Sequence, residues 1–246
     1  MSTLAGKVAL VTGGSRGIGA AIVQALAAQG AAVAFTYAQS ADKADTLVKN
    51  LEEQGHRALA IAADSADARQ VVDAVDRTVA KLGHLDILIN NAGRFFIGTI
   101  DQLSLDDFEH MVSVNLRGVF AASLQAVKYL PDGGRIVSIG SCVATRAWSG
   151  GLSLYAMSKS ALLGLTQGIA RDLGARRITV NLIQPGPIDT DMNPAGGPRA
   201  AATLAQLALP AYGQPQDIAA SVLYLVGESG RNITGAVIDV DGGFNA

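Results

Sequence analysis

The sequence predicts an α/β fold of the doubly wound type, in which helices cover both faces of a parallel sheet. Two observations predict it. Short aliphatic and β-branched runs alternate with longer amphipathic stretches along the 246 residues, and the short runs are continuously apolar, as strands buried on both faces are. A glycine-rich loop at residues 13–19 directly follows the first of these runs. We expect right-handed crossovers between the strands.

Each apolar run predicts a strand and each amphipathic stretch predicts a helix. Strands are predicted at 8–12, 32–37, 58–61, 86–90, 135–139, 178–183 and 236–239, and helices at 17–29, 41–54, 67–82 and 104–129, with a further helix that carries Tyr155 and Lys159. No linker or repeat divides the chain, so we expect one domain over residues 1–246 with a sheet of about seven strands. The region from Gln184 to Gln214 lacks strand character and holds five of the seven prolines. Because long irregular insertions are typical of functional loops, we expect a substrate lid at about 187–213.

The composition limits the class of protein. Hydrophobic residues make up 49% of the chain and charged residues 16%, which excludes a disordered chain. The net charge of −2 comes without a basic stripe, so we expect no nucleic-acid partner. No apolar run reaches the roughly 18 residues that a membrane helix needs. The single cysteine, Cys142, excludes an internal disulfide and fits a reducing compartment. Residues 1–7 lack the pattern of a signal peptide, so we expect a cytoplasmic protein.

The most informative short pattern is Tyr155-Ala-Met-Ser-Lys159. Two residues four apart lie on one face of a helix, one turn from each other. An ammonium that close to a phenol favours the phenolate and lowers the cost of moving a proton near neutral pH. A tyrosine on a helix surface is the plain alternative, which Tyr155 by itself does not exclude.

The glycine loop, Thr12-Gly13-x-x-x-Gly17-x-Gly19, follows a predicted strand and opens a predicted helix. Glycines there permit a tight turn and let the backbone approach a pyrophosphate at the helix N-terminus. The spacing differs from G-x-G-x-x-G, and a turn that binds no ligand is the alternative. The strand, loop and helix context favours a nucleotide site.

Six motifs occur in one order along the chain. They are Thr12 to Gly19, Asn90-Asn-Ala-Gly93, Asn115, Ser141, Tyr155-x-x-x-Lys159 and Pro185-Gly186. The series resembles that of the short-chain dehydrogenase/reductase family, and the resemblance extends from residue 6 to Gly243. It implies a Rossmann domain and an NAD(P)-dependent oxidoreductase that acts on CH-OH and C=O groups.

The resemblance implies a catalytic set of four residues. Tyr155 would be the general acid in carbonyl reduction and the base in alcohol oxidation. Ser141 would donate a hydrogen bond to the substrate oxygen. Lys159 would lower the pKa of Tyr155 and bind the nicotinamide ribose, and Asn115 would hold a water that links Lys159 to solvent.

The resemblance also implies a cofactor site built from loops that follow the strands. Asp64 matches a residue that contacts the adenine amino group, with a helix N-cap as its alternative role. Thr190 and the Ile188 amide match contacts to the nicotinamide end. The residues expected to bind the cofactor are Gly13, Ser15, Arg16, Gly17, Ile18, Gly19, Tyr37, Ser40, Asp64, Ser65, Asn91, Ala92, Gly93, Tyr155, Lys159, Pro185, Gly186, Ile188 and Thr190.

The end of the second predicted strand bears on the choice between NAD(H) and NADP(H). A carboxylate there would bind the ribose 2′-hydroxyl of NAD, but residues 36–40 contain no acid. The guanidinium of Arg16 is suited to a 2′-phosphate, and Ser40 and Lys43 are placed to add to that site. Ala38 stands where many NADP-dependent members carry arginine. NADP(H) is favoured, and NAD(H) stays open.

Several residues invite a catalytic role that the pattern does not support. Cys142 stands beside Ser141 without a histidine placed to activate it. The three histidines lie far apart in the sequence, and we expect no metal site. The two carboxylates of Asp106 and Asp107 are favourable at the N-terminus of a helix, where the helix dipole is positive, and we do not expect them to be a catalytic pair.

The substrate is expected to be a small or medium carbonyl or alcohol compound. The residues expected around it are Ser141, Val143, Trp148, Tyr155 and Met192, with Arg94, Phe95, Phe96 and Asn193 as further candidates. Arg94 would select an anionic substrate, or else it faces solvent. The family commonly forms tetramers, so we expect a homotetramer.

The predicted function is therefore NADP(H)-dependent, reversible carbonyl reduction, with the proton supplied by Tyr155. The alternative is a nucleotide-binding regulator with incidental turnover. Residues 35–37 and 184–191 resemble a small branch of the family that includes cyclic-di-GMP-binding biofilm-dispersal proteins.

Overall fold

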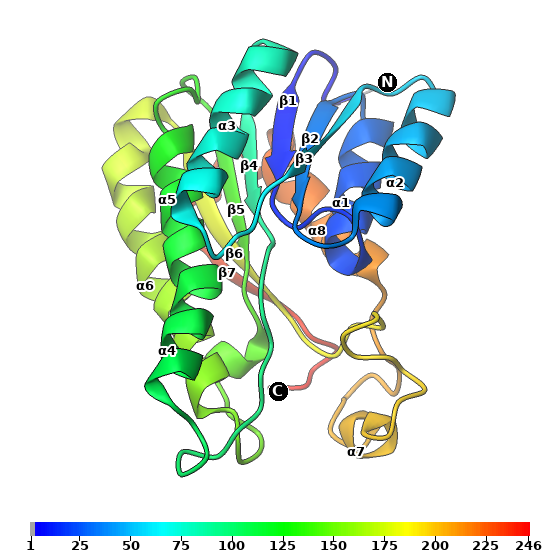
Figure 1. The fold of residues 1–246 in the computed structure, drawn as a ribbon, viewed down its shortest axis with the longest axis vertical. Coiled ribbons are helices and arrows are strands. Elements are labelled where there is room, and N and C mark those ends of the chain that lie inside the picture. Colours follow the sequence, from blue (N-terminus) through cyan, green and yellow to red (C-terminus); the bar gives the residue numbers. More distant parts are fainter. Residues whose placement is uncertain (1–2) are drawn as a thin grey trace.

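The structure of the chain, a computed structural model, describes residues 3–246. Seven parallel strands form one sheet in the order β3-β2-β1-β4-β5-β6-β7 (Figure 1). The strands are β1 Val8–Val11, β2 Ala32–Tyr37, β3 Ala58–Ala62, β4 Ile87–Asn90, β5 Arg135–Ile139, β6 Thr179–Pro185 and β7 Val237–Val240. Every predicted strand is present within two residues of its expected ends. The predicted doubly wound Rossmann fold is confirmed.

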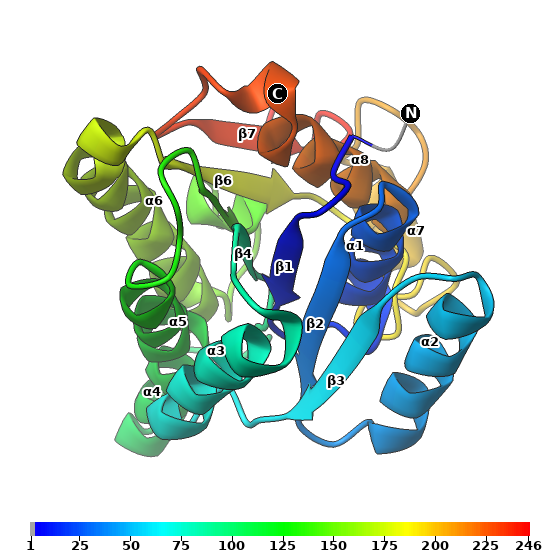
Figure 2. The same ribbon diagram turned by 90° about the horizontal axis from the view of Figure 1, so that it is seen from above.

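Helices cover both faces of the sheet (Figure 2). The helices α1 Gly17–Ala28, α2 Ala41–Glu53 and α8 Pro215–Val226 lie on one face. The opposite face carries α3 Ala68–Leu82, α4 Leu105–Val112, α5 Gly118–Ala126 and α6 Ser153–Leu173. A short helix, α7 Ala200–Leu204, lies in the segment 187–213, and short 3₁₀ turns occur at Cys142–Ala144, Gly174–Arg176 and Glu228–Gly230.

The central strands are buried on both faces, which explains their uninterrupted apolar sequence. Val11 and Ile89 point into the layer beneath α1, α2 and α8, where Ile22 and Val222 are fully buried. Leu10 points to the opposite layer, beneath α3, α5 and α6. No helix of residues 3–246 is long and apolar enough to cross a membrane.

The helix predicted at 104–129 has a π-helical stretch in its middle, at Ser113–Arg117. A Cβ on Gly118 would lie 2.5 Å from the Ser65 carbonyl oxygen, so this helix approaches the loop after β3 very closely. The hydrogen-bond pattern shifts where that approach occurs, as is common near functional residues. Asn115 lies at the centre of the stretch.

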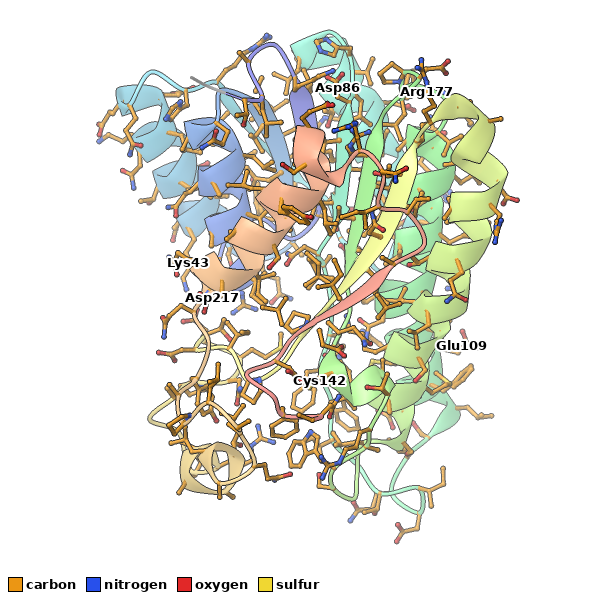
Figure 3. All side chains as sticks on the ribbon, turned by 180° about the vertical axis from the view of Figure 1, so that it is seen from behind. Lys43, Asp86, Glu109, Cys142, Arg177 and Asp217 are labelled. Atoms are coloured by element: carbon orange, nitrogen blue, oxygen red, sulfur yellow. The ribbon has the colours of Figure 1, made fainter. Side chains whose placement is uncertain are left out.

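The amino end of the sheet has its own polar contact. Asp86 is buried and accepts hydrogen bonds from Lys7 Nζ and the Val8 N–H, both at 2.9 Å. Figure 3 shows Asp86 at the top of the molecule and Cys142 in its lower half. The cavity described next lies at the Cys142 end.

Candidate active site

A cavity of about 880 Å³ opens at the carboxyl edge of the sheet. The strand order reverses there between β1 and β4, and the loops after neighbouring strands diverge, which is where such sheets bind ligands. The loops after β1 to β6 all contribute to its walls, and the segment 187–213 lies beyond the strand ends (Figure 1).

The glycine loop has a conformation that larger side chains would disturb. Gly13 and Gly17 have φ angles of 66° and 53°, in the left-handed region. A Cβ on Gly19 would lie 2.2 Å from the Gly13 carbonyl oxygen. The N-terminus of α1 has no side-chain cap and no acid in its first turn. Its N–H groups are therefore free of capping side chains, and this end of the helix fits a diphosphate.

Two polar side chains join the glycine loop to the loop after β4. Asn91 Nδ2 donates to the carbonyl oxygens of Thr12 and Gly13, both at 2.9 Å. The Thr12 hydroxyl accepts from the N–H groups of Asn91 and Ala92 at 3.0 Å. These bonds hold the two loops in register on either side of the switch point.

The end of the cavity beside β2 has cations at its rim. Arg16 is exposed and lines the cavity together with Tyr37 and Ser40. Lys43, in the first turn of α2, pairs with Asp191 of the segment 187–213 at 2.7 Å. Figure 3 shows Lys43 at the end of α2 that faces this segment.

Asp64 lines the cavity directly after β3. The N-cap of α3 is Asp67, whose carboxylate accepts a hydrogen bond from the Arg69 N–H at 2.9 Å. The alternative of a helix cap for Asp64 is therefore wrong.

Ser141, Tyr155 and Lys159 lie together in the cavity wall. Ser141 follows β5, and the other two residues occupy the first two turns of α6. Lys159 Nζ lies 5.9 Å from the centroid of the Tyr155 ring and donates a hydrogen bond to the Ile139 carbonyl at 3.0 Å. The spacing of four along one helix thus places the amine beside the phenol, as the sequence predicts.

Burial shifts the pKa of both groups. It raises the pKa of Tyr155 to about 12, with a hydrogen bond from Ser141 acting in the opposite direction. It also lowers the pKa of Lys159 to about 8. The expected net lowering of the Tyr155 pKa is wrong for the chain by itself, because loss of hydration outweighs the hydrogen bond from Ser141. At pH 7 Tyr155 is a protonated acid beside a protonated amine.

Asn115 lies behind the cavity wall and is 1% exposed. Its Oδ1 accepts from the Arg94 N–H at 2.8 Å, and its Nδ2 donates to Ser158 Oγ at 2.9 Å. These bonds tie the loop after β4 to α6. Asn115 does not line the cavity, and neither do two other residues named as candidates from the sequence, Phe96 and Lys43. The water that Asn115 is expected to hold stays a prediction.

The other predicted site residues all line the cavity. For the cofactor they are Gly13, Ser15, Arg16, Gly17, Ile18, Gly19, Tyr37, Ser40, Asp64, Ser65, Asn91, Ala92, Gly93, Tyr155, Lys159, Pro185, Gly186, Ile188 and Thr190, and for the substrate Ser141, Val143, Trp148, Tyr155 and Met192. Residues from almost the whole chain therefore converge on one space.

The end of the cavity away from β2 is aromatic. Phe95 and Tyr155 meet edge to face with ring centroids 4.9 Å apart, and Trp148 and Phe244 do so at 5.8 Å. Such pairs present flat apolar walls with fixed orientation. This end suits a planar or compact apolar ligand.

Sequence reasoning missed three residues of this wall, Arg199, Thr203 and Phe244. Phe244 is 2% exposed and belongs to the C-terminal segment. Asn245 holds that segment in place, because its Nδ2 donates to the Cys142 carbonyl at 2.7 Å. No local pattern marks these positions, since the folding of remote segments brings them to the site.

Two further interpretations are confirmed. The Cys142 thiol is buried, and burial raises its pKa to about 12, so it is not a nucleophile near neutral pH. Asp107 forms a reciprocal capping box with Ser104 at the start of α4, which is the helix-terminal role expected for this pair of acids.

A Rossmann sheet, an open glycine loop and the Ser141, Tyr155 and Lys159 set in one cavity define a short-chain dehydrogenase/reductase. The chain belongs to this family of oxidoreductases. A family model described as Enoyl-(Acyl carrier protein) reductase matches residues 13–245.

The chain is similar over nearly its whole length to several relatives and solved structures. It is 44% identical over 246 residues to the cyclic-di-GMP-binding biofilm dispersal mediator protein of Escherichia coli K12, covering 100% of both chains. A short-chain dehydrogenase from Burkholderia cenocepacia J2315, solved in complex with NADP, is 55% identical with a TM-score of 0.98, over 99% of this chain and 100% of that one. A blue fluorescent protein from a metagenomic library, solved with NADPH, is 56% identical with a TM-score of 0.98 at the same coverage. The predicted family and branch are confirmed.

Proposed function

We propose that this chain catalyses the reversible, NADP(H)-dependent reduction of a small or medium carbonyl compound to an alcohol. One observation carries the proposal. Ser141, Tyr155 and Lys159 line the same cavity as the glycine loop, so a proton donor and a nucleotide site share one space. The bound NADP and NADPH in two relatives more than half identical to this chain support it.

Ser141 and Tyr155 would each have a separate role in the reduction. When bound, the reduced nicotinamide supplies a hydride to the carbonyl carbon. The Ser141 hydroxyl polarises the carbonyl, and Tyr155 gives its proton to the oxygen as the C=O π bond becomes a C–H and an O–H bond. The high pKa of Tyr155 keeps this proton on the phenol at neutral pH.

Lys159 acts on the phenolate that this transfer leaves behind. Its pKa of about 8 keeps the amine largely protonated at pH 7, beside the Tyr155 ring. The ammonium stabilises the phenolate and so lowers the barrier to transfer. Asn115 orders the wall between the loop after β4 and α6, and the proposed proton relay to solvent passes through this region.

The preference for NADP(H) rests on the charge around β2. Residues 36–40 carry no acid, and Arg16 presents a planar cation to the same end of the cavity. Guanidinium binds phosphate through paired hydrogen bonds. NAD(H) lacks the group that this cation would bind.

A regulatory role is the second candidate, because the E. coli relative is named as a cyclic-di-GMP-binding protein. A pure nucleotide binder has no need of the Ser141, Tyr155 and Lys159 set. We therefore place nucleotide regulation second to catalysis.

The lid, the assembly and the location are further parts of the proposal. The segment 187–213 would close over the bound ligands, since its residues line the cavity from Pro187 to Thr203.

Phe120 and Leu124 of α5 are 52% and 57% exposed, which suits a contact between subunits in a homotetramer. A cytoplasmic location stays a prediction.

The test is turnover of NADPH with a panel of aldehydes, ketones and quinones, with NADH in parallel. Tyr155→Phe removes the transferable proton and keeps the ring, so we expect carbonyl reduction to fall at least a hundredfold with NADPH affinity unchanged. Tyr224→Phe, at an exposed position of α8 outside the cavity lining, is the matched control for loss of a phenol hydroxyl. Activity that survives Tyr155→Phe would refute the acid role.

A further inference from the structure

The segment 187–213 places one cation at the aromatic end of the cavity. The guanidinium carbon of Arg199, at the start of α7, lies 5.8 Å from the centroid of the Phe95 ring. The Phe95 and Tyr155 rings meet edge to face, with their centroids 4.9 Å apart. Phe95 is therefore in contact with both the guanidinium and the ring of the proton donor.

The N–H donors of the Arg199 guanidinium are unused within the described part of the chain. In residues 3–246 no carboxylate lies within ion-pair distance of its side chain, and no hydrogen bond of its guanidinium is formed. Contact with the face of Phe95 orients the guanidinium without using its N–H groups. The residue is exposed toward the cavity that it lines. An oriented guanidinium with free N–H groups is suited to a planar anion.

The carboxylates of the cavity lie elsewhere. Asp64 follows β3 at the nucleotide end, and Asp191 is paired with Lys43. Arg94, which also lines the cavity, lies close enough to Asp107 to lower the pKa of that carboxyl, and Arg146 donates a hydrogen bond to the Phe244 carbonyl at 3.1 Å. Among the arginines of the described residues that line the cavity, Arg199 is thus the one that lies over an aromatic ring and pairs with no acid.

We propose that the substrate is an aromatic carbonyl compound that carries a carboxylate, which Arg199 binds beside the Phe95 ring while Tyr155 faces the carbonyl. The inference rests on the proposed function and names the substrate class of the same site. Trp148 and Phe244 supply the flat walls for the ring, and the carboxylate lies at the edge remote from the carbonyl. Reduction then proceeds as described, with the hydride to the carbonyl carbon and the Tyr155 proton to the oxygen.

The experiment compares 4-acetylbenzoate with its methyl ester and with benzaldehyde, at saturating NADPH. The acid and the ester share the ring and the ketone and differ in the charge. We expect kcat/KM of the wild-type chain to be at least tenfold higher for the acid than for the ester. Arg199→Met should lower kcat/KM for the acid about thirtyfold through KM, and leave the ester and benzaldehyde within twofold. Arg199→Lys should restore part of the loss.

Arg171→Met, at an exposed position of α6 outside the cavity lining, is the matched control and should leave the preference for the acid unchanged. NADPH affinity of Arg199→Met is measured alongside and should equal that of the wild type. Equal losses for acid and ester, weaker NADPH binding, or a wild-type preference for the ester would each overturn the substrate class while the reductase function stands. Absence of turnover with all three compounds, in the wild type and in Tyr155→Phe alike, would overturn the reductase function as well.

Discussion

Replacing Lys159 by methionine is expected to stabilise the folded chain and to abolish turnover. Lys159 is 4% exposed, and its amine has a carbonyl oxygen, Ile139 O, as its hydrogen-bond partner. Methionine fills a similar volume without a charge. The difference in unfolding free energy between the variant and the wild type therefore measures the cost of burying an ammonium at this position.

The magnitude follows from the pKa of the amine. Burial lowers it from 10.5 to about 8, and each pKa unit corresponds to about 1.4 kcal/mol. Keeping Lys159 protonated at pH 7 thus destabilises the folded state by roughly 3 kcal/mol. Loss of the hydrogen bond to Ile139 offsets about 1 kcal/mol of this. We expect Lys159→Met to be about 2 kcal/mol more stable at pH 7.

The sign of the pH dependence provides the sharper test. Between pH 8 and 10.5 the unfolded chain holds a proton on Lys159 that the folded chain has released, so wild-type stability gains from this residue as the pH rises. The advantage of the variant should therefore shrink by about 2 kcal/mol between pH 7 and pH 10.

Urea unfolding without cofactor, at one protomer concentration, measures both quantities. Lys49→Met, at an exposed position of α2, should match the wild type at both pH values. A Lys159→Met chain less stable than the wild type at pH 7, or a difference that does not change with pH, would refute the reasoning.

Two further predictions concern the ends of the sheet. Arg16→Met should weaken NADPH binding about tenfold and leave NADH binding unchanged, because the guanidinium is placed for a 2′-phosphate. Fluorescence titration measures the affinity for both cofactors, with Arg171→Met as the control. An equal loss of affinity for NADPH and NADH would contradict the assignment. Asp86→Ala should destabilise the chain by about 2 kcal/mol, because the buried Val8 N–H loses its acceptor. Urea unfolding measures this loss of stability, with Asp73→Ala at an exposed position of α3 as the control. A loss of stability no larger than that of the control would show that the contact of Asp86 with Val8 is dispensable.

The sequence predicts most of the fold because strands buried on both faces leave an unmistakable pattern. The seven runs of apolar residues match the seven strands, and the loops after them carry the site because parallel strands end at one edge. Helix α8 was not predicted, although Pro215 at its first position and the capping box of Gln214 and Asp217 were visible signals.

Other features depend on contacts that no local pattern contains. The π-helical stretch around Asn115 arises where Gly118 meets the Ser65 carbonyl, two elements far apart in the chain. Phe244 and Arg199 reach the cavity through the folding of the C-terminal segment and of the segment 187–213. The raised pKa of Tyr155 likewise depends on burial, which spacing alone does not give.

The unneutralised charge of Lys159 also bears on the choice between catalysis and regulation. No carboxylate of residues 3–246 pairs with it, so the fold keeps a buried ammonium that an apolar residue would replace with a gain in stability. A chain whose only task is to bind a nucleotide gains from this charge only if the ammonium contacts the cofactor, which is the second role expected for Lys159. A Lys159→Met variant that is more stable, binds NADPH with little loss and turns over no carbonyl would show that the charge serves proton transfer. A variant that is more stable but loses NADPH binding would instead assign the charge to the cofactor and leave regulation open.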